Sequence, residues 1–179
     1  QLFRMRQVGE TFVGGKNINR HGDHKVPLSI VRAYIAKTPV FGALQRGGRV
    51  YAHAVPYTKS RTVQPIRRRC ITSGSTVYSD EWSAYRGLND KYDHNFIVHG
   101  AKQYANGDCC TNGIENFWSI FKRGIVGIYH RTSRKHLQKY VQEFVYRFNT
   151  REMSDSERFY DFLSRTDKRL TYKQLVTNG

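Results

Sequence analysis

The sequence predicts an α/β domain in which helices flank a mixed β-sheet, and three observations lead to this fold class. Residues 5–56 contain three consecutive segments of strand composition. Two further strand segments follow, with helical or helix-starting segments between them. Beyond residue 110 the apolar residues change from a period of two to a period near 3.6, which is typical of amphipathic helices. With 179 residues, 39% of them hydrophobic, the chain suits one compact domain with a buried core.

The first three strands are predicted to run antiparallel. The stretch RQVGETFVGG is rich in strand-forming residues and ends at Gly14-Gly15. Residues 16–38 are polar and basic without a clean period, so we interpret them as a mobile loop. The segments PVFGALQ and RVYAHAVP are joined by Arg46-Gly47-Gly48, whose glycines supply the positive φ that a tight turn needs.

The middle of the chain is predicted to alternate helix and strand. Residues 61–71 indicate a short helix with Pro65 near its first turn, where a missing N–H costs least. In TVYSDEWSAY a β-branched run passes into a polar segment that starts a helix, so Asp80 falls at the C-terminal end of a strand. HNFIVHG, residues 94–100, is the next predicted strand.

Three helices are predicted after residue 110. In TNGIENFWSIFKRG the apolar residues recur at helical spacing and Gly124 is the expected stop. The stripe expected to be buried consists of Ile114, Phe117, Trp118 and Phe121. The segment SRKHLQKYVQEFVYRFN repeats this pattern behind a Ser133 cap.

The last helix is expected to begin at Ser154, with Glu157 completing a capping box. Its apolar face is expected to be buried through Phe159, Phe162 and Leu163. We therefore divide the chain into a catalytic domain at residues 1–152 and a helical extension at residues 153–179 that packs on the same domain.

The charge of the chain predicts a polyanionic partner. Lys and Arg number 30 against 14 Asp and Glu, which gives a net charge of +16 that folding does not require. Basic residues cluster beside aromatic ones, as in Arg67-Arg68-Arg69 and Tyr129-His130-Arg131, and this pattern favours nucleic acid over a merely solvated basic surface.

Other classes of protein are excluded by what the sequence lacks. There is no apolar run long enough to span a membrane, no signal peptide and no long amphipathic basic helix, so we expect a cytoplasmic protein without a membrane partner. The three cysteines include no CxxC pair, which argues against both a disulfide framework and a zinc site.

Acidic residues are few in this basic chain, so their positions are informative. Asp80 ends a strand, where side chains of open α/β sheets project into a ligand crevice. Glu115 and Lys122 lie two helical turns apart on one side of a helix, and Asn112 lies one turn before Glu115. Asp80 and Glu115 are therefore candidates to meet over one divalent ion. By spacing alone, a solvated helix face and a helix N-cap explain these residues equally well.

Such an arrangement suits the cutting of DNA. Two Mg²⁺ ions roughly 3.5–4 Å apart activate a water molecule, stabilise charge in the transition state and take oxygen ligands from a few Asp or Glu residues. Lys122, a compact cation, is placed to contact a phosphate.

The chain resembles the ISXO2-like transposase domain of bacterial insertion sequences, a member of the DDE superfamily that is related to the eukaryotic Merlin elements. The resemblance extends over residues 7–152. The matching strings are ETFVGGKN, KTPVFGALQRGGRV, GSTVYSDEWSAYRGL and QYANGDCCTNGIENFWSIFKRGIVGIYHRTSRKHLQKYVQEFVYRFNTR. It implies an RNase H-like fold, metal-dependent cutting of transposon ends and joining of the freed 3′-OH to target DNA. It also implies a two-metal site for Mg²⁺ or Mn²⁺ and at least a dimer on double-stranded DNA, at the bacterial nucleoid.

The resemblance assigns roles to individual residues. The second catalytic Asp of the family falls on Asp80 and the third acid on Glu115, so both are the expected metal ligands. Lys122 is the trailing basic residue. Asn112 is a second candidate for the third position, because some branches of the family are described with Asn there.

The first catalytic Asp is the point of departure from the family. Similar proteins have Asp-Glu-Thr before the Gly-Gly pair, and here Gly9 occupies the Asp position. Glu10 is a poor substitute, because adjacent strand residues face opposite sides of a sheet. We therefore expect a transposase architecture that is inactive or severely impaired. A non-enzymatic DNA-binding protein derived from a transposase, acting as a repressor or a host-adopted module, is the alternative, and a structure-specific nuclease is a third possibility.

Basic residues expected to contact DNA are spread along the chain. They are Lys16, Arg20, Arg67, Arg68, Arg69, Arg123, His130, Arg131, Arg134 and Lys135.

Overall fold

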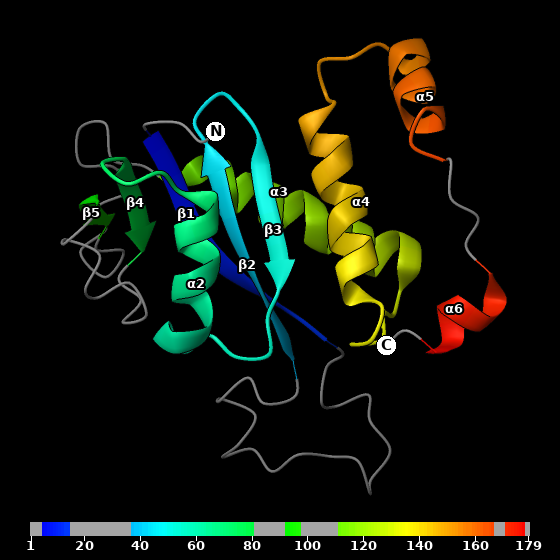
Figure 1. The fold of residues 1–179 in the computed structure, drawn as a ribbon, viewed down its shortest axis with the longest axis horizontal. Coiled ribbons are helices and arrows are strands. Elements are labelled where there is room, and N and C mark those ends of the chain that lie inside the picture. Colours follow the sequence, from blue (N-terminus) through cyan, green and yellow to red (C-terminus); the bar gives the residue numbers. More distant parts are fainter. Residues whose placement is uncertain (1–4, 15–36, 81–91, 98–110, 167–170, 178–179) are drawn as a thin grey trace, which may run out of the picture.

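A mixed β-sheet organises the fold (Figure 1). The computed structural model describes residues 5–14, 37–80, 92–97, 111–166 and 171–177. Within these ranges five strands, in the order β3-β2-β1-β4-β5, form the sheet: β1 (Met5–Val13), β2 (Thr38–Gln45), β3 (Val50–Ala54), β4 (Thr76–Asp80) and β5 (Asp93–Ile97). The pairs β1–β2 and β2–β3 are antiparallel, whereas β1–β4 and β4–β5 are parallel. The predicted fold class is therefore confirmed.

Helices cover both faces of this sheet. They are α2 (Ser60–Cys70), α3 (Asn112–Gly124), the π-helix η5 (Ile125–Tyr129), α4 (Leu137–Asn149), α5 (Asp155–Leu163) and α6 (Tyr172–Thr177). Figure 1 shows α2 in front of the sheet, α3 behind it, and α4 alongside β3. None of the helices in the described ranges is long and apolar enough to cross a membrane.

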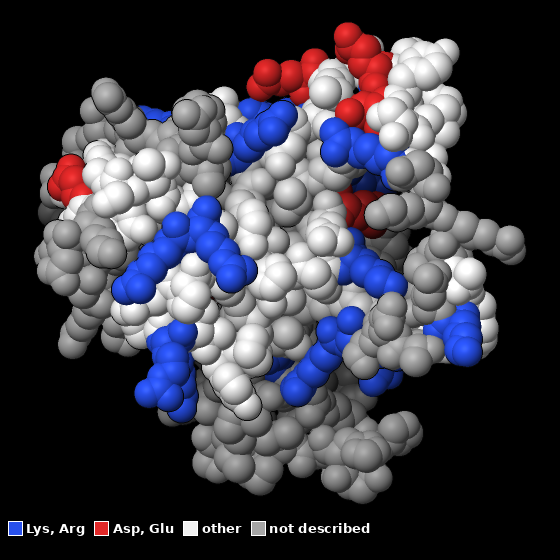
Figure 2. All heavy atoms as spheres, in the orientation of Figure 1, with Lys and Arg blue, Asp and Glu red and all other residues white. Residues whose placement is uncertain are grey.

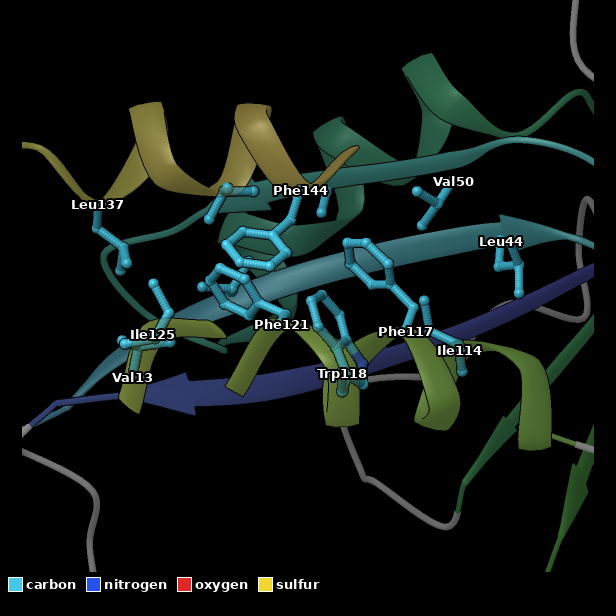
Figure 3. Close-up of a cluster of buried hydrophobic side chains, with 13 residues drawn as sticks. Val13, Leu44, Val50, Ile114, Phe117, Trp118, Phe121, Ile125, Leu137 and Phe144 are labelled. Carbon is cyan, nitrogen blue, oxygen red and sulfur yellow. The ribbon is translucent and has the colours of Figure 1, made fainter. Parts of the chain in front are cut away.

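The two faces of the sheet carry separate cores, because side chains of a strand alternate. On the α3 face, Val13, Val40 and Leu44 pack with the stripe predicted for α3. Figure 3 shows Val13 and Leu44 beside that stripe. That stripe, Ile114, Phe117, Trp118 and Phe121, is buried as predicted. On the α2 face, the buried residues are Val8, Phe41, Ala43, Val55, Val63, Cys70, Ile71, Val77 and Tyr92. Odd-numbered positions of β1 therefore face α3, and even-numbered positions face α2.

The predicted ends of two helices have different outcomes. The α-helix ends at Gly124 as predicted, but the chain continues from there directly into η5. A Cβ atom on Gly124 would lie 2.1 Å from Cζ of Phe144, so glycine is needed there for the close approach of α4. Ser133, in contrast, does not cap α4, which begins at Leu137. The Ser133 hydroxyl instead accepts a hydrogen bond from His136 N at 3.3 Å, in the turn before the helix.

Helices α2 and α5 also differ in part from the prediction. Pro65 is the sixth residue of α2 rather than part of its first turn. In α5 the capping box of Ser154 and Glu157 is confirmed, but the predicted burial of its apolar face is wrong. Phe159 and Phe162 are 58% and 54% exposed, because α5 lies beyond the end of α4, away from the sheet (Figure 1). Leu163 is exposed as well. Periodicity shows that a helix has an apolar face but not what covers it.

The outer edge of β3 is covered by side chains of α4. The amide of Asn149 accepts from Val50 N at 2.8 Å and donates to Val50 O at 3.0 Å. Gln138 accepts from Ala54 N at 2.7 Å. An unpaired strand edge exposes backbone groups that promote association with other chains. The side-chain amides of Asn149 and Gln138 therefore form hydrogen bonds with edge groups of β3 that a further strand would otherwise pair with.

The hairpin turn between β2 and β3 follows the prediction, with Gly47 at φ +67°. A different constraint acts on two glycines in the middle of the sheet. Gly9 of β1 and Gly42 of β2 are directly paired, and both lie against Trp118 of α3. A Cβ atom on Gly42 would lie 2.5 Å from Cζ2 of Trp118, whereas one on Gly9 would make only ordinary contacts, the nearest at 3.6 Å. The packing of Trp118 thus requires glycine at position 42 but not at position 9.

We expect Gly42→Ala to lower the free energy of unfolding by about 1–3 kcal/mol, because the added methyl group overpacks the core. The matched variant Gly9→Ala should raise it by about 0.5–1 kcal/mol, since alanine is favoured over glycine within a strand. Urea unfolding followed by circular dichroism measures both changes. Equal destabilisation by the two substitutions would contradict this account of the packing.

Asn149→Ala should lower the free energy of unfolding by about 1–3 kcal/mol, because two backbone groups of Val50 lose their partner. Arg147→Ala is the control, since it removes only an exposed ion pair with Glu143 and should cost less than about 1 kcal/mol. The same unfolding experiment compares them. A similar small loss for both variants would show that α4 does not stabilise the edge of β3.

Candidate active site

The first turn of α3 is fixed to the middle of the sheet by Gln7 of β1. The side-chain oxygen Oε1 of Gln7 accepts a hydrogen bond from Ile114 N at 3.0 Å, and Gln7 is 4% exposed. Gly113 allows this approach, because a Cβ atom there would lie 2.6 Å from the same oxygen. The first four N–H groups of a helix have no acceptor within it, and this bond provides an acceptor for one of them. It also attaches Ile114, the residue before Glu115, to strand β1.

Glu115 itself is exposed on this first turn of α3. Its Oε1 atom accepts a hydrogen bond of 2.6 Å from the hydroxyl of Thr111, which is 3% exposed. A buried hydroxyl donor restricts the carboxylate to a few orientations. Asn112 and Lys122 are exposed on the same helix, at its first and last turns.

Asp80 is the last residue of β4, as predicted, and its register places it near β1. The parallel pairing of β1 with β4 extends as far as Gln7 with Tyr78. Two residues further along both strands, position 80 is level with position 9. Because positions alternate along a strand and Val77 belongs to the α2 face, position 80 belongs to the α3 face.

Position 9 also belongs to the α3 face. The nearest atoms to a Cβ built on Gly9 are Nε1 of Trp118 at 3.6 Å and Cγ2 of Ile114 at 3.7 Å. Positions 9 and 80 are therefore level on adjacent strands, on the face of the sheet that α3 covers, and α3 carries Glu115 on its first turn. Glycine contributes no oxygen at the first of these positions.

Glu10 lies on the opposite face. It is paired with Phe41, which belongs to the core on the α2 face. Directly paired residues of antiparallel strands have their side chains on the same side of the sheet. The Glu10 carboxylate is thus separated from Glu115 by the sheet itself.

One residue expected to contact DNA is buried instead. Arg67 is 1% exposed, because it falls between Val63 and Cys70 on the inner face of α2. Its position in this helical stripe was visible in the sequence and argued against a surface role. Burial lowers the pKa of His94, and the positive charge of Arg67 lowers it further. Arg67 is thus part of the interior on the α2 face, where Ser79 Oγ lies 2.7 Å from Nε2 of His94.

The other basic residues do not form one group. Arg68 and Arg69 are exposed on α2, across the sheet from α3. The exposed residues at and after the end of α3 are Arg123, His130, Arg131, Arg134 and Lys135. Lys135 donates a hydrogen bond to the carbonyl of Val176 in α6. Lys16 and Arg20 lie outside the described residues. In Figure 2, Lys and Arg are scattered over the visible face, while acidic side chains gather towards α5.

A hollow of about 720 Å³ lies at the end of the sheet where β2 begins. It is lined by Phe12, Lys37, Thr38, Pro39, Ala54, Val55, Pro56, Tyr57, Thr58, Lys59, Arg134 and Gln138. Three of these residues are basic and Tyr57 is 64% exposed. Basic and aromatic side chains in one concave surface suit a nucleic-acid strand. Of these basic residues, only Arg134 is among those expected from the sequence to contact DNA.

The candidate ligands suit Mg²⁺ in kind. Asp80 and Glu115 are carboxylates, and oxygen donors of this type are what Mg²⁺ and Mn²⁺ prefer. A group of three or more His, Cys, Asp or Glu residues able to hold a metal is absent from the described part of the chain. Position 9 adds no carboxylate to these two, because it is a glycine.

Comparison with solved structures identifies the fold. The chain resembles the crystal structure of the catalytic core domain of BIV integrase, with a TM-score of 0.50 and 12% sequence identity. The similarity covers 90% of this chain and 94% of that one. The expected RNase H-like fold is thereby confirmed.

Two curated proteins are similar in sequence. An uncharacterized transposase-like protein of Haemophilus influenzae is 30% identical over 105 residues, which is 59% of this chain and 85% of that protein. An uncharacterized protein in the transposable element ISH50 of Halobacterium salinarum is 32% identical over 114 residues, or 60% of this chain and 37% of that protein. The match thus spans less than half of the second relative. A family model described as the ISXO2-like transposase domain matches residues 5–149, and the chain belongs to this family.

Proposed function

We propose that this chain is the catalytic domain of an insertion-sequence transposase, which cleaves DNA and joins strands by metal-dependent phosphoryl transfer, and that Gly9 impairs it. The main support is geometric. A strand end, the middle of the neighbouring strand and the first turn of α3 present positions 80, 9 and 115 on one face of the sheet. Family membership supports the same chemistry.

Each remaining residue has a role in this proposal. Asp80 and Glu115 would hold Mg²⁺ or Mn²⁺, with Thr111 orienting the Glu115 carboxylate. When bound, two such ions supply an activated oxygen nucleophile and stabilise charge on the phosphate. Lys122 contacts a phosphate of the DNA, and Asn112 is a second candidate ligand.

The replacement of Asp by glycine removes a ligand that both ions would share. Losing even a partner in the outer shell of a metal site typically costs about 10–100-fold in metal affinity or activity, so losing a direct ligand should cost at least that. Neither packing nor a left-handed backbone conformation calls for glycine at position 9, where a Cβ atom has room. The substitution therefore affects the site and not the fold.

Double-stranded DNA is the proposed partner, both as element ends and as target. The net charge of +16 supports a polyanion, and cutting two ends implies a dimer or higher assembly on DNA. The proposed location is the bacterial cytoplasm, at the nucleoid.

A non-enzymatic DNA-binding role is the second candidate, and the missing carboxylate favours it. A basic protein can retain its affinity for DNA without the ability to cut, because phosphate contacts do not depend on the metal ligands. The two candidates differ in what happens when the carboxylate is restored.

We expect Gly9→Asp to gain Mg²⁺- or Mn²⁺-dependent nicking of a duplex that carries the ends of the element, by at least about 10-fold over the parent chain. Gly9→Asn and Gly9→Ala are the matched controls, because they add a side chain without a carboxylate, and both should stay at the level of the parent. Gel analysis of labelled strands, with and without EDTA, measures the effect. Binding without nicking by the Gly9→Asp protein would favour the DNA-binding role, and full activity of the parent would refute the ligand assignment.

A further inference from the structure

The indole N–H of Trp118 is a buried donor for which the described part of the chain provides no acceptor. Trp118 is 6% exposed, and its Nε1 atom has no hydrogen-bond partner among the described residues. Most buried N–H groups in folded proteins are paired, because leaving one unpaired costs free energy. A phenylalanine would fill much of this space without that cost. Packing alone therefore does not explain a tryptophan here.

The orientation of the ring is restricted by its neighbours. The six-membered part of the indole lies over Gly42, where even a Cβ atom would clash with Cζ2. Phe117 and Phe121 pack against the ring with centroids at 5.0 and 6.2 Å. Figure 3 shows Trp118 between α3 and the strands, within the aromatic cluster of this face. The N–H group consequently points in a defined direction.

The nitrogen of this group lies beside position 9. The Nε1 atom is the nearest atom to a Cβ built on Gly9, at 3.6 Å, and the next nearest are carbon atoms of Ile114 at 3.7 and 4.0 Å. A carboxylate oxygen lies two bonds beyond Cβ, so one on an aspartate at this position can come within the hydrogen-bond distance of about 2.7–3.2 Å. Glycine itself offers this donor no side-chain acceptor.

We propose that Trp118 is a positioning residue for a carboxylate at position 9, and that the present chain retains the donor of a hydrogen bond whose acceptor it has lost. This inference rests on the proposed function. The indole N–H donates to one oxygen of the carboxylate and leaves the other oxygen available to a divalent ion. Trp118 and Glu115 lie on the same helix, α3. The bond therefore also connects the carboxylate at position 9 to the helix that carries Glu115.

The hydrogen bond is tested without DNA or metal. In a Trp82→Phe background, so that Trp118 is the remaining tryptophan, the indole N–H proton is compared by NMR among the Gly9, Gly9→Ala, Gly9→Asn and Gly9→Asp proteins. We expect a downfield shift and slower exchange with solvent in the Asp and Asn variants, which both carry an acceptor oxygen. The Ala variant, which adds only a Cβ atom, should resemble the parent. Identical signals in the Ala, Asn and Asp variants would overturn the proposal.

The positioning role is tested in the Gly9→Asp protein. Adding Trp118→Phe should weaken Mn²⁺ binding by about 10–100-fold, as expected for losing the hydrogen-bond partner of a ligand. Phe117→Leu is the control, because it also reduces the core beside α3 but removes no donor. Calorimetric titration measures the affinity, after circular dichroism has shown that each variant folds. Equal Mn²⁺ affinity with and without the indole would overturn the positioning role.

The two proposals fail in distinguishable ways. A shifted indole signal together with strong Mn²⁺ binding but no DNA cleavage would support Trp118 as a positioning residue and refute the proposed function. Cleavage by Gly9→Asp with an unshifted indole signal would support the function and overturn the role of Trp118.

Discussion

The contact between α3 and β1 is the constraint on which the rest of the site depends. Gln7 holds the first turn of the helix by its bond to Ile114 N, and Trp118 lies one turn further on over Gly42. A helix attached at two points can neither slide along the strand nor rotate about its own axis. The exposed side of α3, including Glu115, is thereby fixed relative to the strands that carry positions 9 and 80. The contact between α3 and β1 therefore determines both the packing of this core and the position of Glu115.

The same contact makes different demands on two paired glycines. Gly42 is essential to the packing of Trp118, whereas Gly9 contributes little to the core, although the two residues are paired in adjacent strands. In the proposed function a carboxylate at position 9 serves the metal and not the packing, so the fold does not depend on it. We infer that the N–H of Trp118, which has no acceptor among the described residues, is the donor for such a carboxylate.

The basic charge of the chain is distributed in a way that total charge does not reveal. Arg67 is buried beneath the sheet, and its neighbours Arg68 and Arg69 lie on the face opposite to α3. Other basic residues follow α3 in the sequence or line the hollow near Tyr57, and Arg134 does both. A duplex bound at Glu115 would meet only some of these groups. Contacts predicted from local clusters of basic residues therefore need the fold before they can be assigned to one surface.

The sequence by itself determined the strand segments, the mixed sheet, the buried stripe of α3 and the capping box of α5, because these follow from periodicity and from hydrogen bonds within a few residues. It also singled out position 9, where glycine departs from the family pattern. Only the tertiary structure decided that Gly124 serves the approach of Phe144, that Arg67 is interior and that the apolar residues of α5 stay exposed. It likewise paired Asn149 with the edge of β3 and placed the indole nitrogen of Trp118 beside position 9. The physical reason is that each of these outcomes depends on a partner distant in the sequence, and a local pattern specifies which face of an element is apolar but not what packs against it.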